Sequence, residues 1–167
     1  MAQLAGALYM RQEYSEAEIW LGRAADLGDN TALGTLGALV SERDPERAEI
    51  YLRKAAAAGV DFAMHNLGVM LENRSHGEAM VWYLKAAQRG YAPSMHTLGI
   101  KMRSVRPTEA MRWLSFAAEL KGFADSMLAL ARMLEDSDPT AAQHWYAMAA
   151  EAEHSGAAAA PGPRPGA

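Results

Sequence analysis

An aromatic side chain returns at a nearly fixed spacing along the chain, inside a constant frame of small and apolar residues. The aromatic residues are Trp20, Tyr51, Trp82, Trp113 and Trp145, at intervals of 31, 31, 31 and 32 residues. Alanine precedes each of them by three positions, and an Ala-Ala pair follows four and five positions later. A glycine follows the first four pairs, and eight residues after it comes leucine with glycine or alanine behind it. This periodicity predicts a repeat protein in which each repeat is one supersecondary element.

Each repeat is predicted to be a pair of helices, because helix start signals fall at two fixed places in the period. Asn30 and Asp61 are expected N-caps, whose side chains accept hydrogen bonds from the first free backbone amides of a first helix. Ser75 and Glu78 have the spacing of a capping box at the start of a second helix. The first helices are expected to begin near Asn30, Asp61, Ala92 and Ala124, and the second helices just after Asp44, Ser75, Arg106 and Asp138.

Glycines are expected to end the second helices, since glycine readily adopts the left-handed conformation found after many helix C-termini. They are Gly28, Gly59, Gly90 and Gly122. Together with the start signals they predict five helix pairs in a repeat domain over 1–154, with repeats at about 1–28, 29–59, 60–90, 91–122 and 123–154. The segment 155–167 is rich in Ala, Gly and Pro without periodicity, and we expect a flexible tail there.

The fixed residues of the frame indicate packing between neighbouring helix pairs. Ala63, Leu67 and Leu71 form an apolar stripe at helical spacing that should face the core. Alanines and glycines allow helices to approach closely, and one large aromatic per repeat should fill the space between layers. The fold class that follows is all-α, an α-solenoid with a right-handed superhelix. Its predicted structural core residues are Trp20, Tyr51, Trp82, Trp113 and Trp145.

Two segments resemble a known repeat family. They are WYLKAAQRGYAPSMHTLG at 82–99 and AEIYLRKAAAAGVDFAMHNLG at 48–68, and both are similar to the Sel-one-like repeat, a relative of the tetratricopeptide repeat. The resemblance extends from residue 1 to about residue 154. It implies a helical repeat scaffold for protein interaction, such as an adaptor in a bacterial cell, with no chemistry of its own.

Composition and charge exclude several other classes of protein. The chain has no cysteine, so no disulfide framework is expected. A net charge of −4 provides no general basic field, which argues against nucleic acid as a partner. We also find no apolar run of about 18 residues and no secretory leader, so the expected location is cytoplasmic without membrane association.

The residues offer no arrangement typical of an enzyme or a metal site. His65 and His96 occupy equivalent repeat positions, and neither belongs to a pattern such as H-E-x-x-H. The glycines are explained by helix ends and close packing rather than by a phosphate-binding loop. The 11 methionines fall largely on repeated core positions, such as the one shared by Met64, Met95 and Met127. The prediction is therefore a noncatalytic protein without catalytic residues, metal or cofactor.

A binding surface is predicted on the first helices, on the side turned away from the apolar stripe. In helix-pair solenoids these helices usually line the concave face, and an apolar strip with amide groups there suits an extended peptide. A merely solvated inner face is the alternative. The candidate binding residues are His65, Asn66, Val69, His96, Thr97, Ile100 and Arg132.

Charge is uneven between the last two repeats. Residues 91–122 carry a net +3 and residues 123–154 a net −5, which indicates either solvated helix ends or a basic patch for an acidic peptide. The primary hypothesis is a scaffold or adaptor that binds a protein or peptide. The alternative is an assembly or regulatory module that forms a homo-oligomer, or docks onto another domain, through its uncapped ends.

Overall fold

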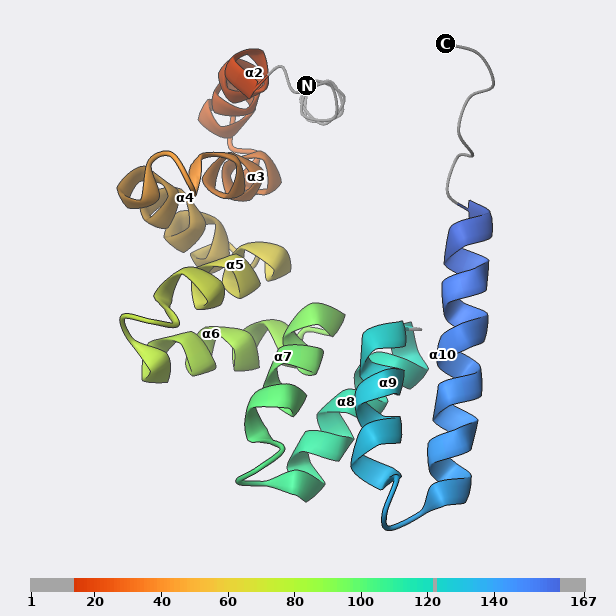
Figure 1. The fold of residues 1–167 in the computed structure, drawn as a ribbon. Helices are drawn as coiled ribbons and strands as arrows, with labels where there is room; N and C mark the ends of the chain where they lie inside the picture. Colours follow the sequence, from red (N-terminus) through yellow and green to blue (C-terminus); the bar gives the residue numbers. More distant parts are fainter. Residues whose placement is uncertain (1–13, 122, 160–167) are drawn as a thin grey trace. The chain divides into compact units, whose positions relative to one another are not determined.

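The described part of the chain is entirely helical in its regular secondary structure. A computed structural model describes residues 14–121 and 123–159 (Figure 1). Among these residues the helices are α2 (Tyr14–Asp26), α3 (Asn30–Val40), α4 (Pro45–Ala57), α5 (Asp61–Leu71), α6 (His76–Gln88), α7 (Ala92–Met102), α8 (Pro107–Lys121), α9 (Ala124–Leu134) and α10 (Pro139–Ala159). The predicted all-α, solenoid-like repeat fold is confirmed.

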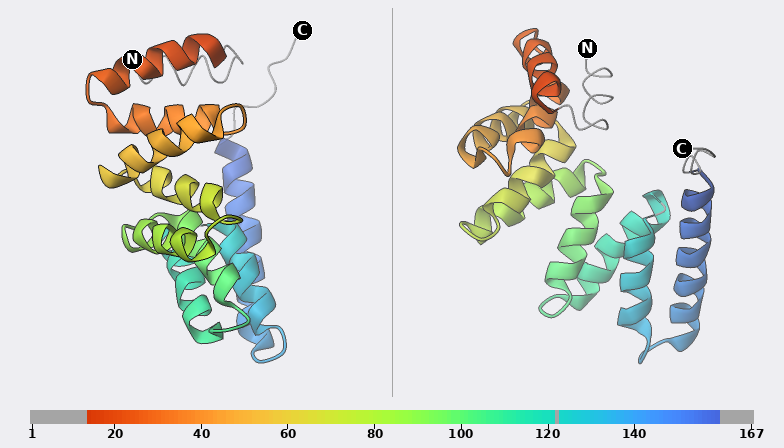
Figure 2. Two further views of the ribbon diagram at one scale, coloured as in Figure 1. Left: turned by 90° about the vertical axis from the view of Figure 1, so that its left-hand side faces the viewer. Right: turned by 45° about the horizontal axis from the view of Figure 1, so that its top comes forward.

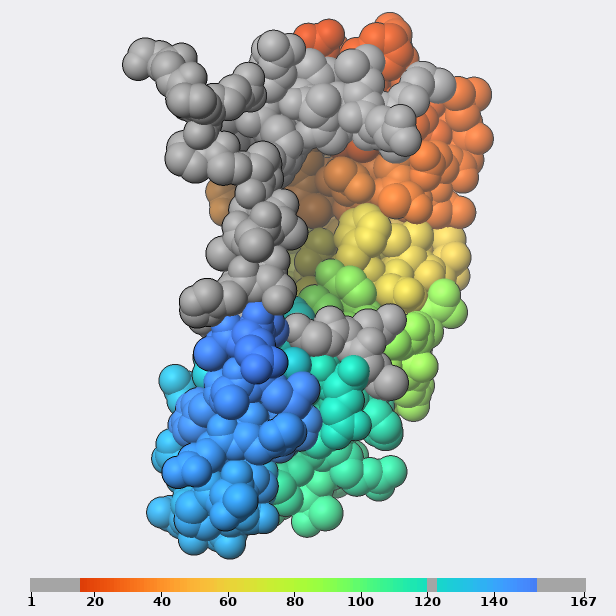
Figure 3. All heavy atoms as spheres, turned by 90° about the vertical axis from the view of Figure 1, so that its right-hand side faces the viewer, coloured from red at the N-terminus to blue at the C-terminus, as the bar shows by residue number. Residues whose placement is uncertain are grey.

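The chain divides into two compact units, Met1–Arg89 and Gly90–Ala167, which we call the N-terminal and C-terminal units. In the N-terminal unit, α2 to α6 pack consecutively, and the first helices α3 and α5 also touch each other (Figure 2). In the C-terminal unit, α7 to α10 pack consecutively, and the first helices α7 and α9 touch. Figure 3 shows the face of the C-terminal unit that α10, in blue, presents to the viewer. Each unit is thus a short stack of helix pairs.

The helices begin where the repeat predicts and end at glycines as expected. α3, α5, α7 and α9 start at the four residues named for first helices, and α4, α6, α8 and α10 start directly after the four named for second helices. Gly28, Gly59 and Gly90 have φ angles of 90°, 89° and 91°, the left-handed conformation expected of them. Gly122 lies outside the described residues.

Two of the predicted helix caps are wrong. Asp29, not Asn30, caps α3: its carboxylate accepts hydrogen bonds from the backbone amides of Thr31 and Ala32, both at 2.9 Å. Asp61 is likewise the first helical residue, and the preceding Val60 provides no side-chain cap. A side chain must stand one residue before the helix to reach the free amides, which explains both shifts.

The predicted capping box at the start of α6 is also absent. Ser75 is the N-cap residue but makes no side-chain capping bond. The Glu78 carboxylate instead accepts hydrogen bonds from Arg53 at 2.6 Å and from the Trp82 indole at 3.4 Å. The Glu78 carboxylate therefore pairs with a charged residue of the neighbouring α4, although the local sequence pattern predicts that it caps the start of α6.

In α2, α4, α6 and α8 the most deeply buried large side chain stands one residue after the repeated aromatic, whereas the corresponding Tyr146 of α10 is only partly buried. Trp20, Tyr51, Trp82, Trp113 and Trp145 are all partly buried. The fully buried residues are Leu21, Leu52, Tyr83 and Leu114, each with 0–2% of its surface exposed. One helical position corresponds to about 100° of rotation, so the aromatic lies on the flank of the helix and its neighbour points to the core. The aromatic residues of α2, α4, α6 and α8 thus lie at the border of the core, and Trp20, Tyr51 and Trp145 pack against its buried clusters.

Cations cover the outer sides of three of these aromatic rings. The Arg23 guanidinium lies 4.9 Å from the Trp20 ring centre, and the Lys85 ammonium lies 4.1 Å from that of Trp82. The Arg47 guanidinium lies 5.7 Å from the Tyr51 ring centre, but it precedes its ring by four positions, whereas Arg23 and Lys85 follow theirs by three. A ring that packs on apolar residues and meets a cation outside suits a half-buried position.

The small residues of the frame lie against the buried position of the partner helix. A Cβ atom on Gly37 would come within 2.8 Å of Leu52, one on Gly68 within 2.7 Å of Tyr83, and one on Gly99 within 2.5 Å of Leu114. These separations are shorter than van der Waals contact, so glycine sets how closely the two helices of a pair approach. The role that the sequence assigned to small residues is confirmed at these three positions.

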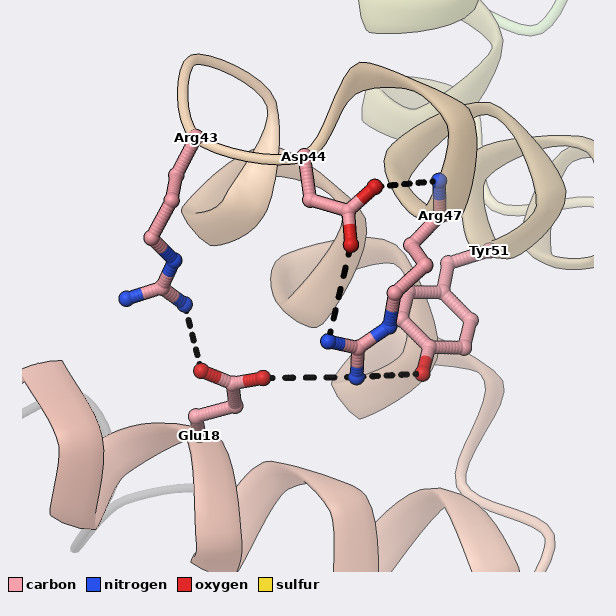
Figure 4. A network of polar contacts seen from close by, with 5 residues as sticks. All are labelled: Glu18, Arg43, Asp44, Arg47 and Tyr51. Atoms are coloured by element: carbon pink, nitrogen blue, oxygen red, sulfur yellow. Dashed lines mark hydrogen bonds and ion pairs between the residues drawn. The ribbon is translucent and has the colours of Figure 1, made fainter.

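Ion pairs link successive second helices on the surface of the N-terminal unit. Glu18 on α2 accepts hydrogen bonds from Arg43 and Arg47, and Arg47 also bonds Tyr51 (Figure 4). One period later, Glu49 pairs in the same way with Arg74. These pairs are partly exposed, and we expect them to contribute little to stability individually.

The last helix is longer than the repeat predicts. α10 continues to Ala159, so residues 155–159 are helical where the sequence led us to expect the start of a flexible tail. Alanine is the residue with the highest helix propensity, and its abundance there extends the helix. Residues 160–167 lie outside the described part of the chain.

Candidate functional site

A groove in the N-terminal unit runs between the two first helices. It has a volume of about 420 Å³ and is bordered by α3, α5 and the turn that leads into α4. We call it the α3–α5 groove. Its lining includes Ala38, Ser41, Glu42, Asn66, Val69 and Met70. Among the described lining residues the surface is mostly apolar, with one hydroxyl, one amide and one carboxylate and without a cationic side chain.

A second groove lies between the first helices of the C-terminal unit. It has a volume of about 580 Å³ and is bordered by α7 and α9. We call it the α7–α9 groove. Its lining includes His96, Ile100, Arg103, Asp125, Arg132 and Met133. Charged side chains thus stand around an apolar floor here.

The two grooves occupy the same place in the repeat. Adding two periods to the residues of the first groove, with one further residue after the insertion near Gly122, gives residues of the second. The corresponding pairs are Ala38 and Ile100, Ser41 and Arg103, Val69 and Arg132, and Met70 and Met133. The fold therefore builds one type of groove twice, and the side chains at three of these four positions distinguish the two.

Five of the seven predicted binding residues line these grooves. Asn66 and Val69 lie in the α3–α5 groove. His96, Ile100 and Arg132 lie in the α7–α9 groove. The side of the first helices that was predicted from the position of the apolar stripe is therefore hollowed in both units.

His65 and Thr97 are placed differently. The His65 ring packs on the buried Tyr83 of α6, with the ring centres 5.4 Å apart, and burial lowers the pKa of His65. The Thr97 hydroxyl donates a hydrogen bond to the Pro93 carbonyl oxygen at 2.8 Å, one turn back on α7. Both side chains thus engage their own helix pair, and neither belongs to the lining of a groove.

His96 connects the wall of the α7–α9 groove to α9. Its Nδ1 lies 3.1 Å from the Ser126 hydroxyl, and its ring centre lies 5.5 Å from that of Phe123. Burial lowers the pKa of His96, and the nearby Asp125 carboxylate opposes this effect. A neutral imidazole held by a hydroxyl can hydrogen-bond a ligand.

Several groove residues were not among the predicted binding residues. Arg103 and Met133 line the α7–α9 groove, and Ser41 and Met70 line the α3–α5 groove. The signal was present for Arg103, because it follows Ile100 by three positions and residues three apart share a helix face. Met70 and Met133 were assigned to the core from their repeat position, and they are partly buried at the groove floor.

The comparison with protein families identifies the repeat. The profile described as Sel1 repeat matches the chain five times, at residues 1–29, 33–60, 61–91, 94–121 and 124–154. The chain belongs to the Sel1 repeat family. Sel1 repeat proteins are generally scaffolds for protein interaction. A search of curated protein sequences gives no significant match.

Solved structures share this Sel1 repeat fold. A Sel1 repeat protein from Oxalobacter formigenes is similar with a TM-score of 0.80 at 21% identity, over 91% of this chain and 70% of that one. The MamA protein gives a TM-score of 0.61 at 18% identity, over 98% and 96% of the two chains. An immunity protein from Pseudomonas aeruginosa gives 0.58 at 20% identity, over 84% and 58%. At these identities the likeness concerns the fold alone.

Two further observations concern metal ions and membranes. Within residues 14–121 and 123–159, no three His, Asp or Glu side chains are grouped in a way that could hold a metal ion. In the same residues, each helix is too short or too polar to cross a membrane.

A third hollow, of about 350 Å³, lies on the outer side of α8. It is bordered by Trp113 and Phe116, whose rings meet edge to face at 6.2 Å, and by the charged Glu109 and Arg112. Phe116 is 42% exposed. This hollow has no counterpart among the grooves between first helices.

Proposed function

We propose that this protein is a noncatalytic scaffold or adaptor that binds segments of other proteins in the grooves between its first helices. The observation that carries the proposal is the recurrence of the groove. Two structural units place an open hollow at the same repeat positions, although the lining side chains differ. A modular binding surface requires the same hollow in successive repeats, with side chains that differ from one repeat to the next. The two grooves meet this requirement.

The chemistry of the α3–α5 groove fits an extended peptide. Such a segment has backbone amides and carbonyls that need partners, and side chains that need shallow apolar contacts. Asn66 provides an amide that both donates and accepts, and Val69 and Met70 provide the apolar contacts. Val69 is 54% exposed, so this contact surface is available to a ligand.

The proposal places Asn66, Val69, His96, Ile100 and Arg132 in direct contact with the ligand. His65 and Thr97 would act indirectly, through the packing of α5 on α6 and the geometry of α7. The cytoplasmic location and the bacterial source stay predictions from the sequence.

Self-association is the second candidate function. The exposed Phe116 and the partly buried Trp113 of the α8 hollow favour it, because aromatic side chains are enriched in protein interfaces. It predicts a molar mass that rises with protein concentration in size-exclusion chromatography with light scattering. It also predicts that Phe116→Glu abolishes this rise, since a carboxylate would be buried in the interface.

The scaffold proposal is tested by peptide selection followed by binding measurements. Random peptides are selected on the whole protein, and their affinities are measured by isothermal titration calorimetry against Val69→Glu and Ile100→Glu variants. Each variant introduces a charge into one groove. We expect each selected peptide to lose at least about tenfold in affinity for one of the two variants, equivalent to about 1.4 kcal/mol.

A matched control is available on the outer side of α4. Ile50 is 53% exposed, nearly the same as Val69, and lies outside both grooves, so Ile50→Glu should leave the affinities unchanged. If selected peptides bind Val69→Glu, Ile100→Glu and wild type equally well, the grooves are not the binding surface and the proposal is wrong.

A further inference from the structure

The two grooves differ in charge at two corresponding positions of the repeat. The α3–α5 groove has Ser41 and Val69 where the α7–α9 groove has Arg103 and Arg132. The α3–α5 groove also contains the carboxylate of Glu42, and its lining within residues 14–121 and 123–159 includes no cation. The same backbone frame therefore presents a neutral-to-acidic hollow in one unit and a hollow with two guanidinium groups in the other.

The surroundings of both arginines leave them accessible to a ligand. Arg103 is the exposed C-cap residue of α7, and Arg132 is exposed on α9. Arg132 also hydrogen-bonds Tyr146, whose hydroxyl donates to Glu135. Neither arginine takes part in the ion pairs found within the described residues.

The rest of the α7–α9 groove adds apolar and polar contacts. Ile100 and Met133 contribute apolar surface, and His96 contributes an imidazole fixed by Ser126. Asp125 is the acidic residue of the lining, and it would repel a second carboxylate placed directly against it. A suitable ligand therefore combines carboxylates, spaced to meet the two guanidinium groups, with at least one apolar side chain.

We propose that the α7–α9 groove binds acidic peptide segments, with ligand carboxylates on Arg103 and Arg132 and an apolar ligand side chain against Ile100 and Met133. This inference rests on the proposed scaffold function and specifies the ligand of one groove. Guanidinium groups pair with carboxylates through two parallel hydrogen bonds, which gives such a contact geometric selectivity. The whole chain has a net charge of −4, so attraction of an acidic peptide must come from this local site.

The test uses a fluorescein-labelled peptide of alternating leucine and glutamate, with the leucine-glutamine peptide of equal length as its neutral counterpart. Fluorescence anisotropy at low salt measures both affinities for the full chain. We expect the wild type to bind the leucine-glutamate peptide at least about tenfold more tightly. The preference should weaken as salt is raised, because exposed charge pairs are screened.

Exchange of the groove residues makes the test specific. Arg103→Ser combined with Arg132→Val copies the α3–α5 groove and should abolish the preference. Ser41→Arg combined with Val69→Arg, introduced into that double variant, should restore it at the other groove. The control is Arg74→Gln with Arg106→Gln, which removes two ion-paired surface arginines and should retain the preference. Circular dichroism verifies that every variant keeps its helical content.

The outcomes separate this inference from the scaffold function. A preference that survives Arg103→Ser with Arg132→Val overturns the inference. Selected peptides that bind at the α7–α9 groove without any acidic residue also overturn it, while the scaffold function stands. A single-stranded oligonucleotide that competes for Arg103 and Arg132 more tightly than the peptide would assign the groove to a different class of ligand and would likewise contradict it.

Discussion

The N-terminal and C-terminal units have the same frame and different binding chemistry. In both, a glycine of the first helix lies against the buried residue of the second, as Gly68 does with Tyr83 and Gly99 with Leu114. In both, a groove opens between successive first helices. Only the groove of the C-terminal unit presents guanidinium groups among its described lining residues. The comparison shows that the repeated positions determine packing, whereas the positions that vary between repeats determine which side chains line each groove.

The largest effect concerns the buried residue beside each repeated aromatic. Leu114→Ala in the C-terminal unit and Tyr83→Ala in the N-terminal unit should lower the free energy of unfolding by about 2–5 kcal/mol, because each removes a fully buried side chain. Trp113→Ala and Trp82→Ala should cost less than their neighbours, since both rings are partly exposed. Urea denaturation followed by circular dichroism measures all four values. If Trp82→Ala lowers the free energy of unfolding more than Tyr83→Ala does, the repeated aromatic lies at the centre of the core and this account is wrong.

The next effect tests whether the two helices of a pair approach each other equally closely in the two units. Gly68→Ala and Gly99→Ala should each destabilise by about 1–3 kcal/mol, because the added Cβ overlaps a buried side chain. Gly22 lies within α2 with no atom in the way of a Cβ, so Gly22→Ala should stabilise by about 0.5–1 kcal/mol through helix propensity. Thermal denaturation compares the three variants. Stabilisation by Gly99→Ala would show that the C-terminal unit is more loosely packed than the N-terminal unit.

A smaller effect concerns pH, because each unit buries one histidine on a first helix. Burial lowers the pKa of His65 and of His96 below the value of about 6.5 in the unfolded chain. Below that pH the unfolded chain binds protons that the folded chain does not, so the free energy of unfolding should fall as pH drops from about 7 towards 5. Above about 6.5 this contribution to stability is fully present.

Denaturant titrations across that pH range measure the effect in each unit. His65→Gln and His96→Gln should each flatten the curve, and His76→Gln, at an exposed position, is the matched control. The fall should be smaller for His96, because Asp125 favours its protonated form. If both variants leave the curve unchanged, burial of these rings does not contribute to the pH dependence. The carboxylate of Glu49, whose pKa is lowered mainly by its hydrogen bond to Arg74, contributes only at lower pH, below about 4.5.

The smallest effect concerns the ion pairs that link second helices in the N-terminal unit. Glu49 bonds Arg53 at 2.9 Å and also pairs with Arg74. Glu49→Gln should cost only a few tenths of a kcal/mol, because the arginines are exposed and the pairs are screened. The cost should disappear in high salt. A loss of several kcal/mol would mean that these pairs, and not the apolar interior, hold the N-terminal unit together.

The frame of the fold could be predicted from the sequence because it repeats. A period of 31 residues places a helix start signal, a helix stop signal and a small residue at the same points of each repeat. A signal that is weak in one repeat is therefore supported by the same signal in the other repeats. The helix starts and the left-handed Gly28, Gly59 and Gly90 were predicted in this way. The side of the first helices on which the grooves open was predicted too, from the position of the apolar stripe.

The details that depend on tertiary partners could not be predicted. The Glu78 side chain does not take part in capping α6, because Arg53, 25 positions earlier and on another helix, hydrogen-bonds it. His65 does not line a groove as predicted, because its ring packs on the buried ring of Tyr83. The repeated aromatic and its neighbour are both apolar, so the sequence did not distinguish the flank from the centre of the core. In each case the deciding contact lies on a different helix.

The most direct test of the central claim uses the methionines that occupy the same position of the two grooves. Met70 lies in the α3–α5 groove and Met133 in the α7–α9 groove, whereas Met64, Met95 and Met127 are buried. Nuclear magnetic resonance of ¹³C-methyl methionine follows them in one sample, with Met70→Leu and Met133→Leu to assign the two groove signals. Titration with the leucine-glutamate peptide should shift the Met133 signal saturably and leave Met70 and the buried methionines unmoved. Equal shifts at Met70 and Met133, or no shift at Met133 while the peptide binds, would contradict the account that one frame carries two grooves of different chemistry.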